Sequence, residues 1–139
     1  MELAPKRTLQ ALWALLFLVV LSQAVYTLLF ITAQDMPRQW IWGVEGLIFV
    51  LLAPLAGSAL VQMKQYSLGF SALFASSLLN IVQVGVGLTQ FAPFREASHA
   101  VEGLAPAAAA VVAFSFFVYN AAKVLLGLAA ICFGLVKYH

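Results

Sequence analysis

The chain has 139 residues, of which 64% are hydrophobic and 9% are charged, and its formal net charge is +2. Soluble globular domains contain about 25% charged residues, so this composition excludes a water-soluble domain. The basic residues are scattered along the sequence and form no patch that could bind nucleic acid. The single cysteine, Cys132, excludes an intrachain disulfide and the redox or zinc chemistry of cysteine pairs.

The first apolar segment covers residues 8–33 and is predicted to be a transmembrane helix. Lys6 and Arg7 precede an apolar run over residues 9–21, and the small residues that follow resemble the cleavage site of a secretory signal. However, the apolar sequence continues through residues 25–33, and the whole segment of about 26 residues is long enough to cross a bilayer. We therefore expect an uncleaved first span.

Three further apolar spans follow, at about residues 40–63, 66–91 and 107–136. Each is predicted to be helical, because a bilayer offers no hydrogen bonds to bare backbone. Residues 34–38 and the Lys64-Gln65 connection are short, and residues 93–106 form the only long loop. Short connections place neighbouring helices antiparallel. The sequence therefore predicts an all-α integral membrane protein, a single domain that forms an antiparallel bundle of four transmembrane helices.

The basic residues near the ends of the spans predict the orientation. One side of the bundle carries Lys6, Arg7, Lys64 and Lys137, and the other carries Arg38 and Arg95. Cytoplasmic ends of transmembrane helices are enriched in Lys and Arg. We therefore expect both termini in the cytoplasm, in a plasma membrane such as the bacterial inner membrane.

Lys123 lies near the middle of the fourth apolar span. An ammonium group at that depth is costly, so it normally faces the interior of the protein and has a partner. Its central position argues against snorkelling to either membrane surface. We predict that Lys123 marks the floor of a ligand site, with a structural ion pair as the alternative.

Small and polar residues recur at helical spacings in the third and fourth spans. The third-span stripe consists of Gly69, Leu73, Ser76, Asn80, Gln83, Gly87 and Gln90. The fourth-span stripe consists of Phe116, Asn120, Lys123, Gly127, Ala130 and Gly134. Spacings of three and four residues are typical of a packed seam between helices. We expect both stripes to be such seams, and the Gly and Ala residues of the fourth span to pack either within the subunit or between subunits.

The polar residues gather in one half of the predicted membrane. In the predicted orientation, polar positions from all four spans fall in the outer half, and the cytoplasmic half carries mostly small apolar residues. The predicted ligand-binding residues are Gln23, Tyr26, Glu45, Asn80, Gln83, Tyr119 and Asn120, with Lys123 at the floor. The sequence thus predicts a polar cavity that opens outward. Hydrogen bonding between helices is the alternative role of Gln23, Asn80 and Gln83.

Glu45 is the predicted counter-ion of Lys123. The helical rise places Glu45 about 10 Å outward of its helix centre and Lys123 about 2 Å inward of its own. A direct salt bridge therefore requires the lysine to stretch outward and the span boundaries to shift by about one turn. A contact through Tyr119, Asn120 or water is the alternative.

The predicted outer loop holds Glu96, His99 and Glu102 at three-residue spacings. A Glu-x-x-His pair occurs in carboxylate-bridged metal sites, but those sites need a second pair, which the sequence does not contain. The sequence also has no Gly-rich phosphate loop and no Ser/His/Asp set on facing spans. We therefore predict no cofactor, no metal site and no catalytic residues, and a solvated amphipathic loop.

Three functions fit these observations. The leading hypothesis is a membrane protein that binds or transports a small polar or amphipathic molecule in the outward-facing cavity, as a homo-oligomer because four helices enclose little volume. The second hypothesis is a non-catalytic subunit or assembly factor of a larger membrane complex, in which Lys123 and the polar stripes contact partner helices. The third is a membrane enzyme that acts on lipid.

Overall fold

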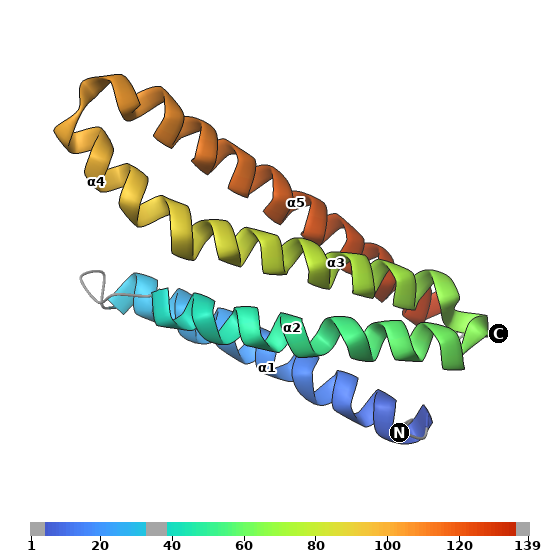
Figure 1. The fold of residues 1–139 in the computed structure, drawn as a ribbon. Helices are drawn as coiled ribbons and strands as arrows, with labels where there is room; N and C mark the ends of the chain where they lie inside the picture. The colour runs from blue at the N-terminus through green and yellow to red at the C-terminus, as the bar shows by residue number, and fades with distance from the viewer. Residues whose placement is uncertain (1–4, 33–38, 136–139) are drawn as a thin grey trace.

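The computed structural model describes residues 5–32 and 39–135, and it consists of four long helices packed antiparallel (Figure 1). These helices are α1 (Pro5–Thr32), α2 (Gln39–Gln62), α3 (Ser67–Val86) and α5 (Ala105–Leu135). Each of them lies in a helical segment that is long and apolar enough to cross a membrane. The predicted all-α, four-span architecture is therefore confirmed.

The connection between the third and fourth spans differs from the predicted loop. The chain leaves α3 through a π-helical turn, η2 (Gly87–Phe91), and continues as the short helix α4 (Ala92–Ala100) and the 3₁₀ turn η3 (Glu102–Leu104). Pro93 lies in the first turn of α4, where a proline without a backbone N–H is tolerated. The prolines of this region therefore start helices, and the prediction of a long loop over residues 93–106 was wrong.

The four long helices form an open arrangement. α1 packs mainly against α2, α2 against α3, and α3 against α5, whereas α1 and α5 have no extensive contact in the described residues. Figure 1 shows that α1 and α2 diverge from α3 and α5 toward the end that holds α4. We call this end the wide end, and we call the end at η1 (Lys64–Tyr66), where α2 and α3 join, the narrow end.

The narrow end is closely packed around small residues. Ala56 and Ala59 of α2 are completely buried. Gly69 of α3 lies so close to α5 that a Cβ atom there would stand 2.7 Å from the ring of Phe133. The rings of Phe70 and Phe133 lie 5.0 Å apart between centroids. Small residues thus let the helices approach one another, as in other membrane bundles.

The third-span stripe faces the interior, as predicted, since its first four members and Gly87 are buried. The fourth-span stripe does not. Asn120, Gly127, Ala130 and Gly134 are exposed on the outer face of α5, and Phe116 is also exposed. The helix instead buries Ser115, Val118, Ala122 and Ala129.

The buried stripe of α5 is shifted by one residue from the predicted one, which is a rotation of about 100°. Both faces of α5 carry small residues at the same spacing, so the pattern could not identify the inner face. Gly127 and Gly134 have open space around them in place of a neighbouring helix. Packing of this stripe within the subunit is therefore wrong, and packing between subunits stays a prediction.

The positions of the charged residues agree with the predicted sidedness. Lys6 and Arg7 at the start of α1 lie at the narrow end with Lys64, and Arg95 of α4 lies at the wide end (Figure 1). Arg38 and Lys137 lie outside the described residues.

Candidate functional site

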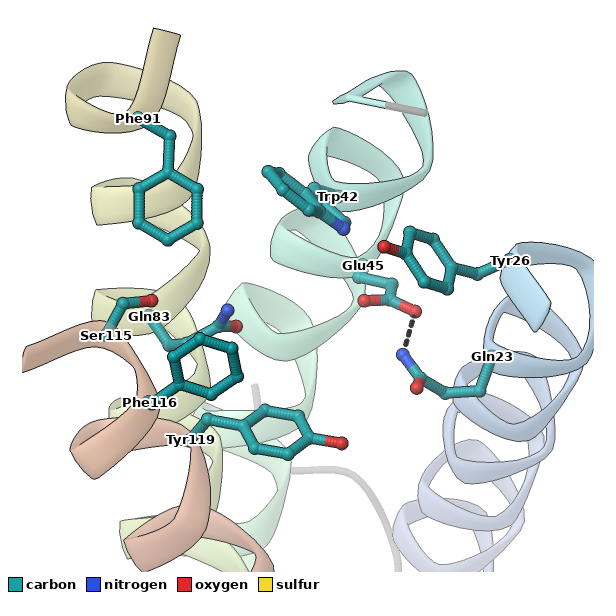
Figure 2. Close-up of a pocket in the computed structure, with 9 residues that line it drawn as sticks. All are labelled: Gln23, Tyr26, Trp42, Glu45, Gln83, Phe91, Ser115, Phe116 and Tyr119. Carbon is teal, nitrogen blue, oxygen red and sulfur yellow. Dashed lines mark hydrogen bonds between the residues drawn. The ribbon is translucent and has the colours of Figure 1, made fainter. Parts of the chain in front are cut away.

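A cavity of about 290 Å³ lies between the four long helices at the wide end (Figure 2). Its lining residues are Gln23, Tyr26, Trp42, Glu45, Gln83, Phe91, Ser115, Phe116 and Tyr119. They come from α1, α2, α3, η2 and α5, so the divergence of the helices creates the space and the large side chains of all four spans surround it.

Among the described residues, Glu45 is the only charged one that lines the cavity, and it is 5% exposed. Ser22 of α1 donates a hydrogen bond of 2.7 Å to its Oε1 atom, and the Gln23 amide nitrogen donates a second bond to the same oxygen. Figure 2 shows the other carboxylate oxygen directed toward the cavity. The described residues provide no hydrogen bond to that oxygen, and a buried carboxylate oxygen without a donor is costly.

Aromatic rings form much of the cavity wall. Trp42 stacks against Tyr26, with centroids 6.4 Å apart and planes inclined by 25°. The ring of Phe91, at the end of the π-helical turn, meets Trp42 edge-on at 6.0 Å. Gly87 makes room for this arrangement, because a Cβ atom there would lie 3.2 Å from the indole. The glycine and the π turn thus position an aromatic cluster on one side of the cavity.

Gln83 and Ser115 add hydrogen-bonding groups. Ser115 is 1% exposed, and Gln83 is half-buried with its amide directed into the space between the helices in Figure 2. Neither side chain makes a hydrogen bond with another described residue. Buried polar groups in proteins are almost always hydrogen-bonded to protein or to water. The cavity therefore presents polar groups that a bound molecule can satisfy.

Lys123 lies next to the cavity but does not line it. Its Nζ atom is 4.8 Å from the ring centroid of Tyr119, one turn away on α5, within the range of a cation–π contact. The negative charge of Glu45 also acts on Lys123, although these two described residues make no direct ion pair. Lys123 thus contacts Tyr119, whereas Tyr119 makes no hydrogen bond to Glu45 in the described residues, so a bridge between Lys123 and Glu45 stays a prediction.

The structure brings five of the eight predicted ligand-binding residues together in one cavity, namely Gln23, Tyr26, Glu45, Gln83 and Tyr119. Asn80 is 3% exposed, and its amide bonds to the Ser76 carbonyl of its own helix at 2.9 Å. Asn120 is exposed, because a residue that follows Tyr119 is rotated by about 100° toward the lipid. Neither Asn80 nor Asn120 lines the cavity, which corrects the predicted lining.

Sequence reasoning missed Ser22, Trp42, Phe91 and Ser115 as residues of this site, and it assigned Phe116 to the packed stripe of the fourth span. A signal for Ser22 was present, because it lies four residues before Tyr26 and three after the buried Val19. No comparable signal existed for Phe91, whose position depends on the π turn.

The cavity is bordered by α1 and α5, which do not close over it. Both helices supply lining residues, and they have no extensive contact in the described parts of the chain. Phe116 is 61% exposed although it lines the cavity. If the four long helices span a bilayer, the surface between α1 and α5 faces lipid, and an opening there is lateral.

Comparison of the chain with protein-family models, with curated proteins and with solved structures finds no match. Function therefore has to be argued from the groups of the site itself. These are one carboxylate, several aromatic faces and several hydrogen-bonding groups around a small space.

Proposed function

We propose that this protein binds a small amphipathic molecule, whose polar part occupies the wide-end cavity and whose apolar part extends between α1 and α5 into the lipid. The cavity carries the proposal. It combines apolar walls with a few convergent polar groups, which is the usual composition of a small-molecule site.

The volume of the cavity limits the size of the group that can bind in it. Drug-sized ligands occupy pockets of about 300 to 1,000 Å³, and the volume here is about 290 Å³. A polar head group fits this space, whereas a whole lipid does not. The rest of an amphipathic ligand can leave through the lateral opening, since α1 and α5 expose many large apolar side chains.

The charge distribution supports an outward-facing site. If the narrow end, with Lys6, Arg7 and Lys64, is cytoplasmic, the cavity lies in the outer half of the membrane. The closely packed narrow end separates it from the cytoplasm. Binding from the outer leaflet requires no rearrangement of the bundle, and transport would require the narrow end to open.

Photolabelling tests the proposal. The full-length protein in dodecyl maltoside micelles is irradiated with decyl amphiphiles that carry a diazirine and a trimethylammonium, alcohol or sulfate head. We expect at least one of them to label Tyr26, Trp42 or Tyr119 in a saturable manner, whereas labelling of the exposed Phe17 and Phe117 does not saturate. Saturable labelling should be lost in Gln83→Trp, which fills the cavity, and kept in Gln65→Trp at the exposed η1 turn. Absence of saturable labelling with all three amphiphiles would refute the proposal.

The outer face of α5 favours a second candidate function, association with a second copy of this chain. Asn120 is exposed there and makes no hydrogen bond with another described residue, and the open space at Gly127 and Gly134 allows another helix to approach. An amide is both donor and acceptor, so two Asn120 side chains can pair across a two-fold axis.

Subunit counting in liposomes tests this candidate. We expect single-molecule photobleaching of the labelled protein to show dimers, and Asn120→Leu to shift them toward monomers. Asn80→Leu provides the matched control, because Asn80 is buried and bonded within its own helix. If the unchanged protein shows only monomers, the proposed dimer is contradicted. If a different membrane protein co-purifies at a fixed ratio, the chain is a subunit of a larger complex and the proposed self-association is contradicted.

A further inference from the structure

We propose that the polar part of the ligand is an alkylammonium group, bound between the free carboxylate oxygen of Glu45 and the aromatic walls of the cavity. This inference rests on the proposed function, since it names the chemical class of the ligand for the same site.

The charge of the residues that line the cavity favours a positively charged ligand. In the part of the chain that the structure describes, Glu45 is the only charged residue that lines the cavity. One of its oxygens is occupied by the Ser22 and Gln23 donors, and the other faces the cavity without a donor from the described residues. A cation satisfies this oxygen, and an anion would be repelled by it at short range.

The aromatic walls favour a cation as well. Tyr26, Trp42 and Tyr119 surround the same space from three helices (Figure 2). The faces of such rings attract ammonium groups, and a cage of aromatic rings is a known mode of quaternary ammonium recognition. The Tyr119 ring already holds one cation in this structure, since Lys123 Nζ lies 4.8 Å from its centroid.

Lys123 makes the inference sharply testable. Its ammonium group lies outside the cavity and feels the charge of Glu45, so it weakens the field that a bound cation experiences. Removal of the Lys123 charge should therefore strengthen the binding of a cation. It should weaken the binding of an anion.

The experiment measures binding by the fluorescence of Trp42. Trp13 and Trp40 are 68% and 55% exposed, so Trp13→Phe and Trp40→Phe leave Trp42 as the single tryptophan without altering the cavity. Decylammonium, decyltrimethylammonium, decanol and decyl sulfate are titrated into the protein in dodecyl maltoside micelles. Affinities are expressed as mole fractions of the amphiphile in the micelle, which removes differences in partitioning.

We expect at least one of the two cations to bind more tightly than decanol, and decyl sulfate to bind most weakly. Glu45→Gln should weaken cation binding by at least about tenfold. Lys123→Met should tighten it by about two- to fivefold. Glu102→Gln, at an exposed position away from the cavity, is the matched control and should change neither value.

Equal affinities for cationic, neutral and anionic heads would overturn the ammonium inference and leave the proposed function intact. Tighter binding of decyl sulfate, weakened by Lys123→Met, would also overturn it. If no amphiphile binds in a saturable manner, the proposed function fails together with the inference. If Glu45→Gln does not fold, two measurements still test the inference. These are the ranking of affinities among the four head groups and the direction in which Lys123→Met changes the affinity for cations.

Discussion

The two ends of this bundle are built from the same four helices but serve different purposes. At the narrow end, Ala56, Ala59 and Gly69 allow the helices to approach until backbone and ring atoms touch. At the wide end, large aromatic and polar side chains point inward, and the helices diverge around a cavity. The size of the inward-facing residues thus determines whether a segment packs closely or encloses space.

The helix α3 shows the difference within one stripe. Its narrow-end members, Gly69 and Leu73, are buried in contact with neighbouring helices. Its wide-end member Gln83 is half-buried and lines the cavity. A single inward-facing stripe can therefore provide close packing at one depth and the lining of a cavity at another.

The largest effect is expected at Gly69, because it tests the close packing of the narrow end. Gly69→Leu places a side chain where a Cβ atom alone would lie 2.7 Å from Phe133, and we expect it to lower the free energy of unfolding by about 3 kcal/mol. Unfolding in mixed micelles with increasing sodium dodecyl sulfate measures this value.

The double variant with Phe133→Ala provides the control. Removal of the ring opens the space that the new leucine needs, so the double variant should be less destabilised than the sum of the two single changes. Simple additivity would show that Gly69 and Phe133 are not packed as described.

A smaller effect is expected where α1 is attached to α2 at the wide end. Ser22→Ala combined with Gln23→Ala removes both donors to Glu45 Oε1 and should lower the free energy of unfolding by about 1–2 kcal/mol. Thr27→Ala is the control, since Thr27 is exposed and bonds only within α1. Equal losses in both variants would mean that Glu45 does not anchor α1.

The smallest change in stability is expected at Gly87, where the effect should fall on binding. Gly87→Ala places a Cβ atom 3.2 Å from Trp42, so the indole must shift by a few tenths of an ångström. We expect it to weaken decyltrimethylammonium binding by about two- to fivefold, which is less than about 1 kcal/mol. Gly85→Ala, two residues away with no atom within 4 Å of the new Cβ, should leave binding unchanged. Identical affinities in both variants would show that Trp42 does not contact the bound ligand.

The sequence predicted the number of spans and the inward face of α3, because hydrophobic length and helical spacing are local properties. It also grouped Glu45, Gln83 and Tyr119, which line one cavity in the structure. It could not predict the inner face of α5, since both faces of that helix carry small residues. It also could not predict the position of Phe91, because the π turn changes the helical register that spacing arguments assume.

The role of Lys123 shows a further limit of sequence reasoning. Its depth led us to predict a ligand site with Lys123 at the floor, and the structure places Lys123 beside the cavity and not in its lining. Its direction depends on the side chain it packs against, and that side chain is Tyr119. The charged group that faces the cavity is Glu45, which counting along the helices placed too far from Lys123 for a direct contact.

The most direct test of the contrast between the two ends is the reactivity of single cysteines toward a small cationic reagent, 2-(trimethylammonium)ethyl methanethiosulfonate. In a Cys132→Ser background, Gln83→Cys lines the cavity and Ala72→Cys lies buried on the same helix toward the narrow end. We expect Gln83→Cys to be modified in the folded protein and Ala72→Cys to react only after unfolding. Equal protection of both positions would contradict a hydrated cavity at the wide end.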